Sequence, residues 1–354
     1  MGNSSDERKP SSRREFLKRS SALTAAVAAG VVTPGALNNT AALLPPLPLN
    51  PETAKAMPTR NLGKTGYKVG IFSLGGQAAV EQPHNEETAI AIVERALDLG
   101  INYIDTAAMY GGRERWSQRY VGEVMKRRRK ETYLASKTDD RTRDGSLKLL
   151  EESLRLLHTD QLDAWQLHHV TTQEDVDRIF AKNGAMEALV SAREQKMVRF
   201  LGVTGHADPG VLLQCLERFP FDQILMAVNA ADRHRLSFLE KLLPLAVEKQ
   251  MGIIGMKIPA RGRILESWNP AAAKSGGFEG AAPHAGVLSM KEAMYYTLSH
   301  AVSTVIIGCD SVGQLEENVR LAREFTPLTQ QQIAALEQKT QPIARQALFF
   351  RTWA

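Results

Sequence analysis

The chain has 354 residues, of which 43% are hydrophobic and 23% charged, and it contains two cysteines. This length and composition suit one large folded domain and exclude a disordered, collagen-like or coiled-coil chain, and two cysteines exclude a disulfide-rich scaffold. The net charge is +5, but residues 1–42 carry +3 of it. The rest of the chain is nearly neutral, so it has little general attraction for nucleic acid.

Residues 1–42 have the layout of an export signal. The charged segment 12–18, SRREFLK, precedes a short and mildly apolar run over residues 21–32. This segment resembles a twin-arginine signal peptide, which implies that the twin-arginine (Tat) machinery exports the folded protein, and we expect a periplasmic location. The apolar run is too short for a stable membrane span. A disordered basic tail is the alternative interpretation.

Residues 43–59 contain five prolines and are predicted to form an extended linker, so that the folded domain covers residues 60–354. From residue 69 onward, short apolar segments alternate with amphipathic helical patterns. Eight segments are predicted strands: 69–74, 102–106, 132–137, 164–168, 199–204, 223–229, 252–257 and 304–308. The helical patterns include residues 88–99, 145–157, 185–196, 237–249, 289–299 and 314–324.

Eight strand–helix units predict a single-domain α/β fold, a (β/α)8 TIM barrel. The loop after the first predicted strand contains Gly75 and Gly76 but lacks the glycine fingerprint of a doubly wound dinucleotide-binding fold. The Gly- and Ala-rich insertion over residues 260–287 is long for a barrel connection, and we expect it to act as a lid or to cover a cofactor. Residues 330–350 are predicted to form a C-terminal helix.

Four ionisable residues fall at or just after the C-terminal ends of successive predicted strands: Asp105, Tyr110, Lys137 and His168. Each one alone has a structural explanation, but barrel enzymes place their catalytic groups at this end of the strands. The group suits carbonyl reduction, in which Tyr110 donates a proton and Lys137 lowers the pKa of its phenol. Asp105 holds Lys137, and His168 orients the carbonyl oxygen. The hydride itself requires a nicotinamide cofactor.

The surrounding segments resemble the aldo-keto reductase signature. They are GINYIDTAAMYG over residues 100–111, LASKT over residues 134–138 and LDAWQLH over residues 162–168. The similarity extends from about residue 60 to residue 318. It implies a (β/α)8 barrel, a bound NADPH or NADH, a small carbonyl or alcohol as substrate, and Tyr110 as proton donor.

The resemblance also implies a set of cofactor-binding residues: Gly76, Thr204, Asn229, Met256, Lys257, Gly308, Gln314, Glu317 and Asn318. Gly205 and Met256 replace the asparagine and the tyrosine common in the family. The basic residues that often hold the 2′-phosphate of NADPH are absent near Gln314, and Asp310 would repel this group. NADPH and NADH are therefore equally expected.

Other function classes receive less support. No H-x-H or H-E-x-x-H motif occurs, so no metal site is predicted. The basic run over residues 126–130 suits a solvated helix end better than nucleic-acid binding. The function that the sequence predicts is NAD(P)(H)-dependent interconversion of a carbonyl compound and an alcohol. The alternative is an exported cofactor-binding regulatory module with little turnover, which would exchange electrons with a partner.

Overall fold

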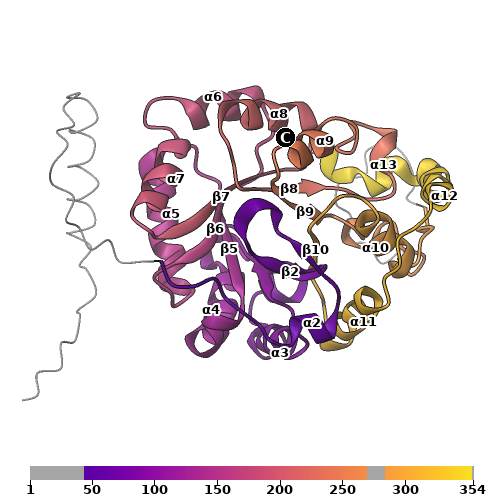
Figure 1. The fold of residues 1–354 in the computed structure, drawn as a ribbon, viewed down its shortest axis with the longest axis horizontal. Helices are drawn as coiled ribbons and strands as arrows, with labels where there is room; N and C mark the ends of the chain where they lie inside the picture. Colours follow the sequence, from indigo (N-terminus) through magenta and orange to yellow (C-terminus); the bar gives the residue numbers. More distant parts are fainter. Residues whose placement is uncertain (1–43, 269–283, 353–354) are drawn as a thin grey trace, which may run out of the picture. The chain divides into compact units, whose positions relative to one another are not determined.

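A computed structural model describes residues 44–268 and 284–352. Eight parallel strands close into a barrel in the order β10-β3-β4-β5-β6-β7-β8-β9, and helices cover its outer surface (Figure 1). The predicted (β/α)8 barrel is confirmed. The export leader and the centre of the 260–287 insertion lie outside the described residues.

Seven of the eight predicted segments match strands of the barrel, and their ends differ from the observed ends by no more than about two residues. The exception is the predicted strand 69–74, which is two strands meeting at Ile71, because β2 belongs to a separate antiparallel hairpin. The observed strands are β1 (Thr59–Asn61), β2 (Lys68–Gly70), β3 (Phe72–Gly75), β4 (Tyr103–Asp105), β5 (Tyr133–Thr138), β6 (Leu162–Leu167), β7 (Val198–Gly205), β8 (Gln223–Ala227), β9 (Gly252–Met256) and β10 (Thr304–Ile307).

The hairpin β1–β2 closes the N-terminal end of the barrel and lies across it in Figure 1. Gly63 in its turn has a φ of +53°, and a Cβ there would lie 2.3 Å from the backbone nitrogen of Gly252. Only glycine fits this close approach. The Tyr67 hydroxyl donates a hydrogen bond of 2.6 Å to the carbonyl of Asn102, which ties the hairpin to the start of β4.

The helices follow the strands in the expected alternation, with two helices after β6. Their amphipathic faces bury apolar side chains against the outside of the barrel. They are α2 (Thr53–Ala56), α3 (Glu86–Asp98), α4 (Trp116–Arg128), α5 (Arg143–Leu156), α6 (Gln173–Phe180), α7 (Ala185–Glu194), α8 (Pro209–Arg218), α9 (Leu242–Glu248), α10 (Met290–Leu298), α11 (Val312–Arg323), α12 (Gln330–Thr340) and α13 (Ala344–Ala347).

The predicted linker is structured in its second half. Asn50 is buried and donates a hydrogen bond of 2.9 Å to the carbonyl of Leu97, and the Thr53 hydroxyl donates one of 2.7 Å to the carbonyl of Gly100. These bonds hold α2 against the end of α3. The chain therefore contacts the barrel well before residue 60, where the sequence places the start of the domain.

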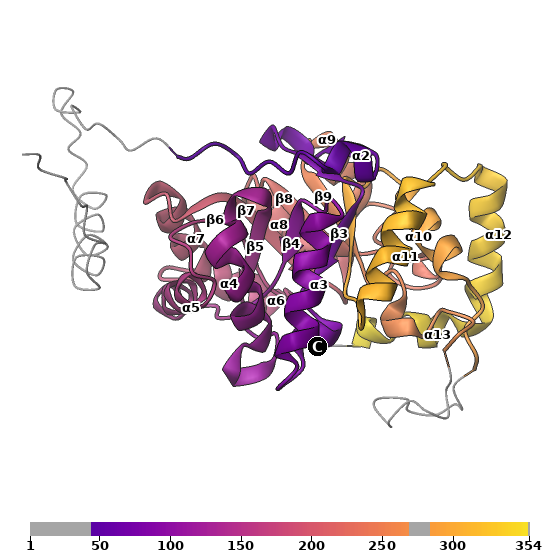
Figure 2. The same cartoon turned by 90° about the horizontal axis from the view of Figure 1, so that it is seen from below.

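The C-terminal segment caps the end of the barrel opposite the hairpin, and α2 and α13 lie on opposite sides in Figure 2. The predicted helix over residues 330–350 is instead broken after α12, because Pro342 lacks a backbone N–H. Beyond α13, the fully buried Arg351 pairs with Asp232 and donates a hydrogen bond of 2.7 Å to the carbonyl of His206, just past β7. This segment thus rests on the C-terminal end of the strands.

Candidate active site

The four ionisable residues predicted from the sequence lie together at the C-terminal ends of three neighbouring strands. Asp105 ends β4, Lys137 lies near the end of β5, and His168 follows β6 directly. Tyr110 lies in the loop after β4, and its ring meets that of His168 edge to face, with 5.6 Å between the centroids. Because adjacent parallel strands end on the same side of the barrel, residues 31 to 63 positions apart converge in this way.

Lys137 and Asp105 form a buried ion pair at the base of the site. Their side chains are 0% and 1% exposed, and the Lys137 ammonium also donates a hydrogen bond of 2.8 Å to the carbonyl of Thr106. The second carboxylate oxygen of Asp105 accepts a hydrogen bond of 3.4 Å from the Gln166 amide. Burial raises the pKa of Asp105 and lowers that of Lys137, whereas the ion pair opposes both shifts.

Tyr110 is the third member of this chain of contacts. Its hydroxyl lies 3.4 Å from the Lys137 nitrogen, which stands 4.8 Å from the centre of the phenol ring. The net shift of the Tyr110 pKa is upward, so the lowering expected from Lys137 does not decide the protonation of the phenol. Burial and then the Asp105 charge raise the pKa of Tyr110 well above its ordinary value, because Asp105 already balances the ammonium. At neutral pH the phenol therefore keeps its proton.

His168 completes the group as a neutral imidazole. Burial, followed by the Lys137 charge, lowers its pKa well below the ordinary value. Its Nδ1 atom is buried and has no hydrogen-bond partner among the described residues. A buried polar atom without a partner costs free energy, and His168 is not among the residues that line the cavity beside Tyr110.

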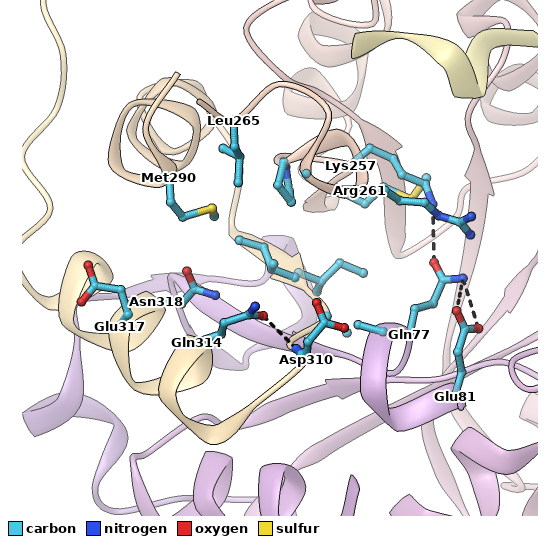
Figure 3. Close-up of a pocket in the computed structure, with 18 of the residues that line it drawn as sticks. Gln77, Glu81, Lys257, Arg261, Leu265, Met290, Asp310, Gln314, Glu317 and Asn318 are labelled. Carbon is cyan, nitrogen blue, oxygen red and sulfur yellow. Dashed lines mark hydrogen bonds between the residues drawn. The ribbon is translucent and has the colours of Figure 1, made fainter. Parts of the chain in front are cut away.

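A cavity of about 850 Å³ extends from Tyr110 and Asp105 along the C-terminal face to the start of α11 (Figure 3). Six of the nine predicted cofactor residues line it: Met256, Lys257, Gly308, Gln314, Glu317 and Asn318. Pro259 and the described parts of the insertion also contribute to its wall, the latter through Arg261, Gly262, Leu265, Ser267 and Trp268.

The other three predicted cofactor residues do not line this cavity. A Cβ on Gly76 would lie 2.6 Å from both the Asp105 carbonyl and the Ser117 hydroxyl, so this glycine serves the packing of β3 against β4. Thr204 is buried, and its hydroxyl accepts a hydrogen bond of 3.1 Å from the backbone of His169. The Asn229 amide donates to the carbonyls of Lys257 and Ala347, so a C-terminal contact uses the group predicted to meet the cofactor.

Comparison with known proteins decides the family. Residues 68–341 match the model of the Aldo/keto reductase family. The chain belongs to the aldo/keto reductase family. It is accordingly an oxidoreductase, and the catalytic-end cavity is the place where members of this barrel class act.

Individual relatives agree with this assignment. L-galactose dehydrogenase of Arabidopsis thaliana is 29% identical over 309 residues, which cover 80% of this chain and 94% of the relative. The NADP(+) aldo-keto reductase yakc of Schizosaccharomyces pombe is 28% identical over 163 residues, which cover 42% of this chain and 46% of the relative. The holo structure of aldo-keto reductase AKR11C1 from Bacillus halodurans superposes with a TM-score of 0.65, at 26% identity, over 79% of this chain and 96% of that one.

In this aldo/keto reductase, three cavity residues were missed by the sequence reasoning: Gln77, Glu81 and Arg261. The Lys257 ammonium lies 3.5 Å from the side-chain oxygen Oε1 of Gln77, and the Gln77 side-chain amide donates at 3.3 Å to Glu81 (Figure 3). Burial, followed by the Arg261 charge, lowers the pKa of Lys257 to about 7, and burial raises the pKa of Glu81. For Gln77 and Glu81, the available signal was their position as polar residues in the loop after β3, the first barrel strand.

The cavity of this aldo/keto reductase suits a nicotinamide dinucleotide. Two cationic side chains, Lys257 and Arg261, line it and can meet a pyrophosphate. A Cβ on Gly308 would lie 2.9 Å from the backbone carbonyl oxygen of Gln77, so glycine at this place lets the loop after β10 pack against the loop after β3. Within residues 44–268 and 284–352, no group of three or more His, Cys, Asp or Glu side chains is arranged to hold a metal ion. In the same ranges no helix is both long and apolar enough to cross a membrane.

Proposed function

We propose that the protein is an NAD(P)(H)-dependent oxidoreductase that interconverts a carbonyl compound and an alcohol, with Tyr110 as the proton donor. One observation carries this proposal: the phenol of Tyr110, bonded to a buried Lys137–Asp105 pair, stands at one end of a cavity large enough for an extended nucleotide. When bound, the nicotinamide supplies or accepts the hydride. The residues of the chain then handle the proton and the charge.

Tyr110 is suited to donate a proton to the substrate oxygen. Because burial raises the pKa of its phenol, the group is protonated at neutral pH and ready to give its proton as negative charge develops on that oxygen. The phenolate left behind is stabilised by the Lys137 ammonium 3.4 Å away. Stabilising the phenolate is the same effect as lowering the pKa of the phenol, so Lys137 opposes the rise in pKa that burial causes.

Asp105 and His168 have separate roles in this proposal. Asp105 fixes the Lys137 ammonium beneath the phenol and keeps it charged despite complete burial. His168 is neutral, and its ring packs against that of Tyr110, where we propose that the imidazole orients the substrate oxygen. Neutrality matters because an imidazolium here would add a second positive charge beside Lys137.

We further propose that the substrate is a small polyhydroxylated compound such as a hexose. The relative from Arabidopsis thaliana is named for L-galactose. The carboxylate of Glu81 lines the cavity close enough to Tyr110 for its charge to raise the phenol's pKa. Carboxylates accept hydrogen bonds from sugar hydroxyls. The cofactor is NADPH, as in the name of the Schizosaccharomyces pombe relative, or NADH.

Export by the twin-arginine pathway remains a proposal that rests on the segment 12–18. Replacing both Arg13 and Arg14 by Lys should shift the protein from the periplasmic to the cytoplasmic fraction of its bacterial host. An unchanged periplasmic fraction would contradict this export route.

The proposed chemistry is tested by Tyr110→Phe, which removes only the hydroxyl. We expect kcat for a panel of aldehydes, ketones and aldoses to fall by about 100-fold or more, while nucleotide binding, followed by tryptophan fluorescence, stays within about twofold. His84→Gln, at an exposed position, serves as a control that should keep full activity. Undiminished turnover in Tyr110→Phe would rule out the proposed role. Tight nucleotide binding by the wild type without any turnover would favour the regulatory module.

A further inference from the structure

Charge is divided unequally along the cavity. Among the described lining residues, the positive side chains are Lys257 and Arg261, which lie with Gln77 and Glu81 in one part of the cavity. The part formed by the β10–α11 loop and the first turns of α11 is lined by Asp310, Gln314, Glu317 and Asn318 (Figure 3). The α11 end of the cavity therefore presents carboxylates and amides.

The proposed function fixes which end holds which half of the nucleotide. The reacting ring must lie beside Tyr110, where the proton is transferred, and the pyrophosphate then meets Lys257 and Arg261. The adenosine half is left for the α11 end. Leu265 and Met290 lie across the cavity from α11 and offer apolar contacts to a base (Figure 3).

Of the two carboxylates at the α11 end, Glu317 pairs with a cation outside the cavity lining, whereas Asp310 has no ion pair among the described residues. Glu317 makes a bidentate pair with Arg320 at 2.7 and 2.9 Å, and hydrogen bonding to Arg320 lowers the pKa of Glu317, which keeps it ionised. Arg320 also pairs with Glu324 at 2.8 Å, so one guanidinium serves two carboxylates. Arg320 does not line the cavity.

Asp310 presents its carboxylate from the loop that begins α11. Its backbone N–H donates a hydrogen bond of 2.8 Å to the Gln314 side chain, while Ser311 caps the helix through the backbone N–H of Gln314. These two bonds fix the loop without using the Asp310 carboxylate. An exposed carboxylate at this place can accept a hydrogen bond from a ribose hydroxyl, as acidic residues do in other NAD-binding sites.

We propose that this cavity selects NADH over NADPH, and that Asp310 is the main determinant. The inference rests on the proposed function, since it assumes that a nicotinamide dinucleotide lies in the cavity. A free 2′-hydroxyl is a donor that matches Asp310, whereas a 2′-phosphate adds a charge of nearly −2 at the same place, next to Asp310 and Glu317. No described lining residue at this end supplies a compensating cation.

The test measures binding of both nucleotides to the full chain by isothermal titration. We expect NADH to bind at least about tenfold more tightly than NADPH. Asp310→Asn, which keeps the shape of the side chain, should reduce this ratio by about fivefold or more, mainly by tightening NADPH binding. Glu316→Gln removes the same charge from α11, where Glu316 pairs with Arg95 outside the cavity lining, and should leave the ratio unchanged.

The outcomes separate the two proposals. NADPH binding as tightly as NADH would overturn the preference, and an unchanged ratio in Asp310→Asn would overturn the role of Asp310. Either result would leave the proposed function standing. Binding of neither nucleotide to the wild-type chain would overturn the proposed function, and the preference with it.

Discussion

At the scale of single residues, the site depends on charges that burial makes costly. Lys137 and Asp105 are both shielded from water, so each is tolerated only because the other is present. Lys257 lines the same cavity, and its pKa is lowered to about 7 by burial. The buried Lys137–Asp105 pair and Lys257 should therefore respond to substitution and to pH differently from charges on the surface.

Asp105→Asn should destabilise the protein, because it leaves the Lys137 ammonium buried without a counter-charge. We expect the free energy of unfolding, measured by urea denaturation, to fall by about 3 kcal/mol and kcat to fall by about 100-fold. The double variant Asp105→Asn/Lys137→Met should recover most of the stability but none of the activity. Equal stability of Asp105→Asn and the wild type would show that the pair does not carry a buried charge.

Lys257 should make nucleotide binding depend on pH. A lysine with a pKa of about 7 is charged below this pH and neutral above it, so its attraction for a pyrophosphate is present at pH 6 and lost toward pH 8.5. We expect the dissociation constant for the nucleotide to rise by about tenfold over this range. Lys257→Met should bind weakly with little pH dependence, whereas Glu81→Gln, which removes a second titrating group of the cavity, should keep it. A flat profile in the wild type would contradict this assignment.

The sequence predicts which residues gather beside Tyr110 better than it predicts which residues line the cavity. Asp105, Lys137 and His168 lie at strand ends, and strand order alone brings strand ends together. The contacts of Thr204 and Asn229 instead depend on packing against His169 and Ala347, which no local pattern reveals. The upward shift of the Tyr110 pKa likewise follows from burial, whose extent cannot be read from spacing.

At the scale of elements, the C-terminal segment holds both ends of the insertion over the cavity. The Gln346 amide donates hydrogen bonds of 2.8 Å to the carbonyls of Arg263 and His284, and its carbonyl oxygen accepts one of 2.9 Å from the His284 backbone. Phe349 lies 3.9 Å below the Arg263 guanidinium. Residues close to Arg263 in the chain line the cavity, and the residues after His284 lead into α10. The C-terminal segment therefore positions part of the cavity wall.

Gln346→Met should loosen this wall without touching the catalytic group. Three hydrogen bonds to buried or half-buried backbone groups are lost, so we expect the free energy of unfolding to fall by about 2 kcal/mol. Nucleotide binding should weaken several-fold, while kcat at saturation changes little. Gln341→Met, the same change at an exposed position of the segment, is the matched control. An unaltered dissociation constant in Gln346→Met would show that the segment does not support the site.

Element boundaries show where periodicity misleads. The apolar run over residues 69–74 has the pattern of one strand, but at Ile71 the chain passes from the hairpin to the barrel. The Ile71 N–H donates to the carbonyl of Pro58, whereas its carbonyl accepts from Val305. These distant partners, and not the local pattern, divide the run into two strands. Helical periodicity continues past Pro342, yet the missing N–H ends α12 before it. The eight-strand alternation, in contrast, is a long-range regularity, and it predicted the barrel correctly.

At the scale of the whole molecule, the barrel belongs to an enzyme family, while its proposed export raises the question of cofactor supply. Both cysteines, Cys215 and Cys309, are free and buried, and burial raises the pKa of each thiol to about 12. Neither thiol is therefore reactive at neutral pH, and the fold contains no disulfide that would require an oxidising compartment. These properties suit folding before export, as the leader implies.

The most direct measurement of the central claim follows a deuterium atom. The protein is incubated with nucleotide carrying deuterium at the transferable position of its reduced nicotinamide, together with the panel of carbonyl compounds, and the products are examined by mass spectrometry. Hydride transfer predicts alcohols that carry one deuterium on the former carbonyl carbon, formed by the wild type and lost in Tyr110→Phe. Bound nucleotide that keeps its deuterium in the presence of every carbonyl compound would contradict the enzyme and leave the non-catalytic module.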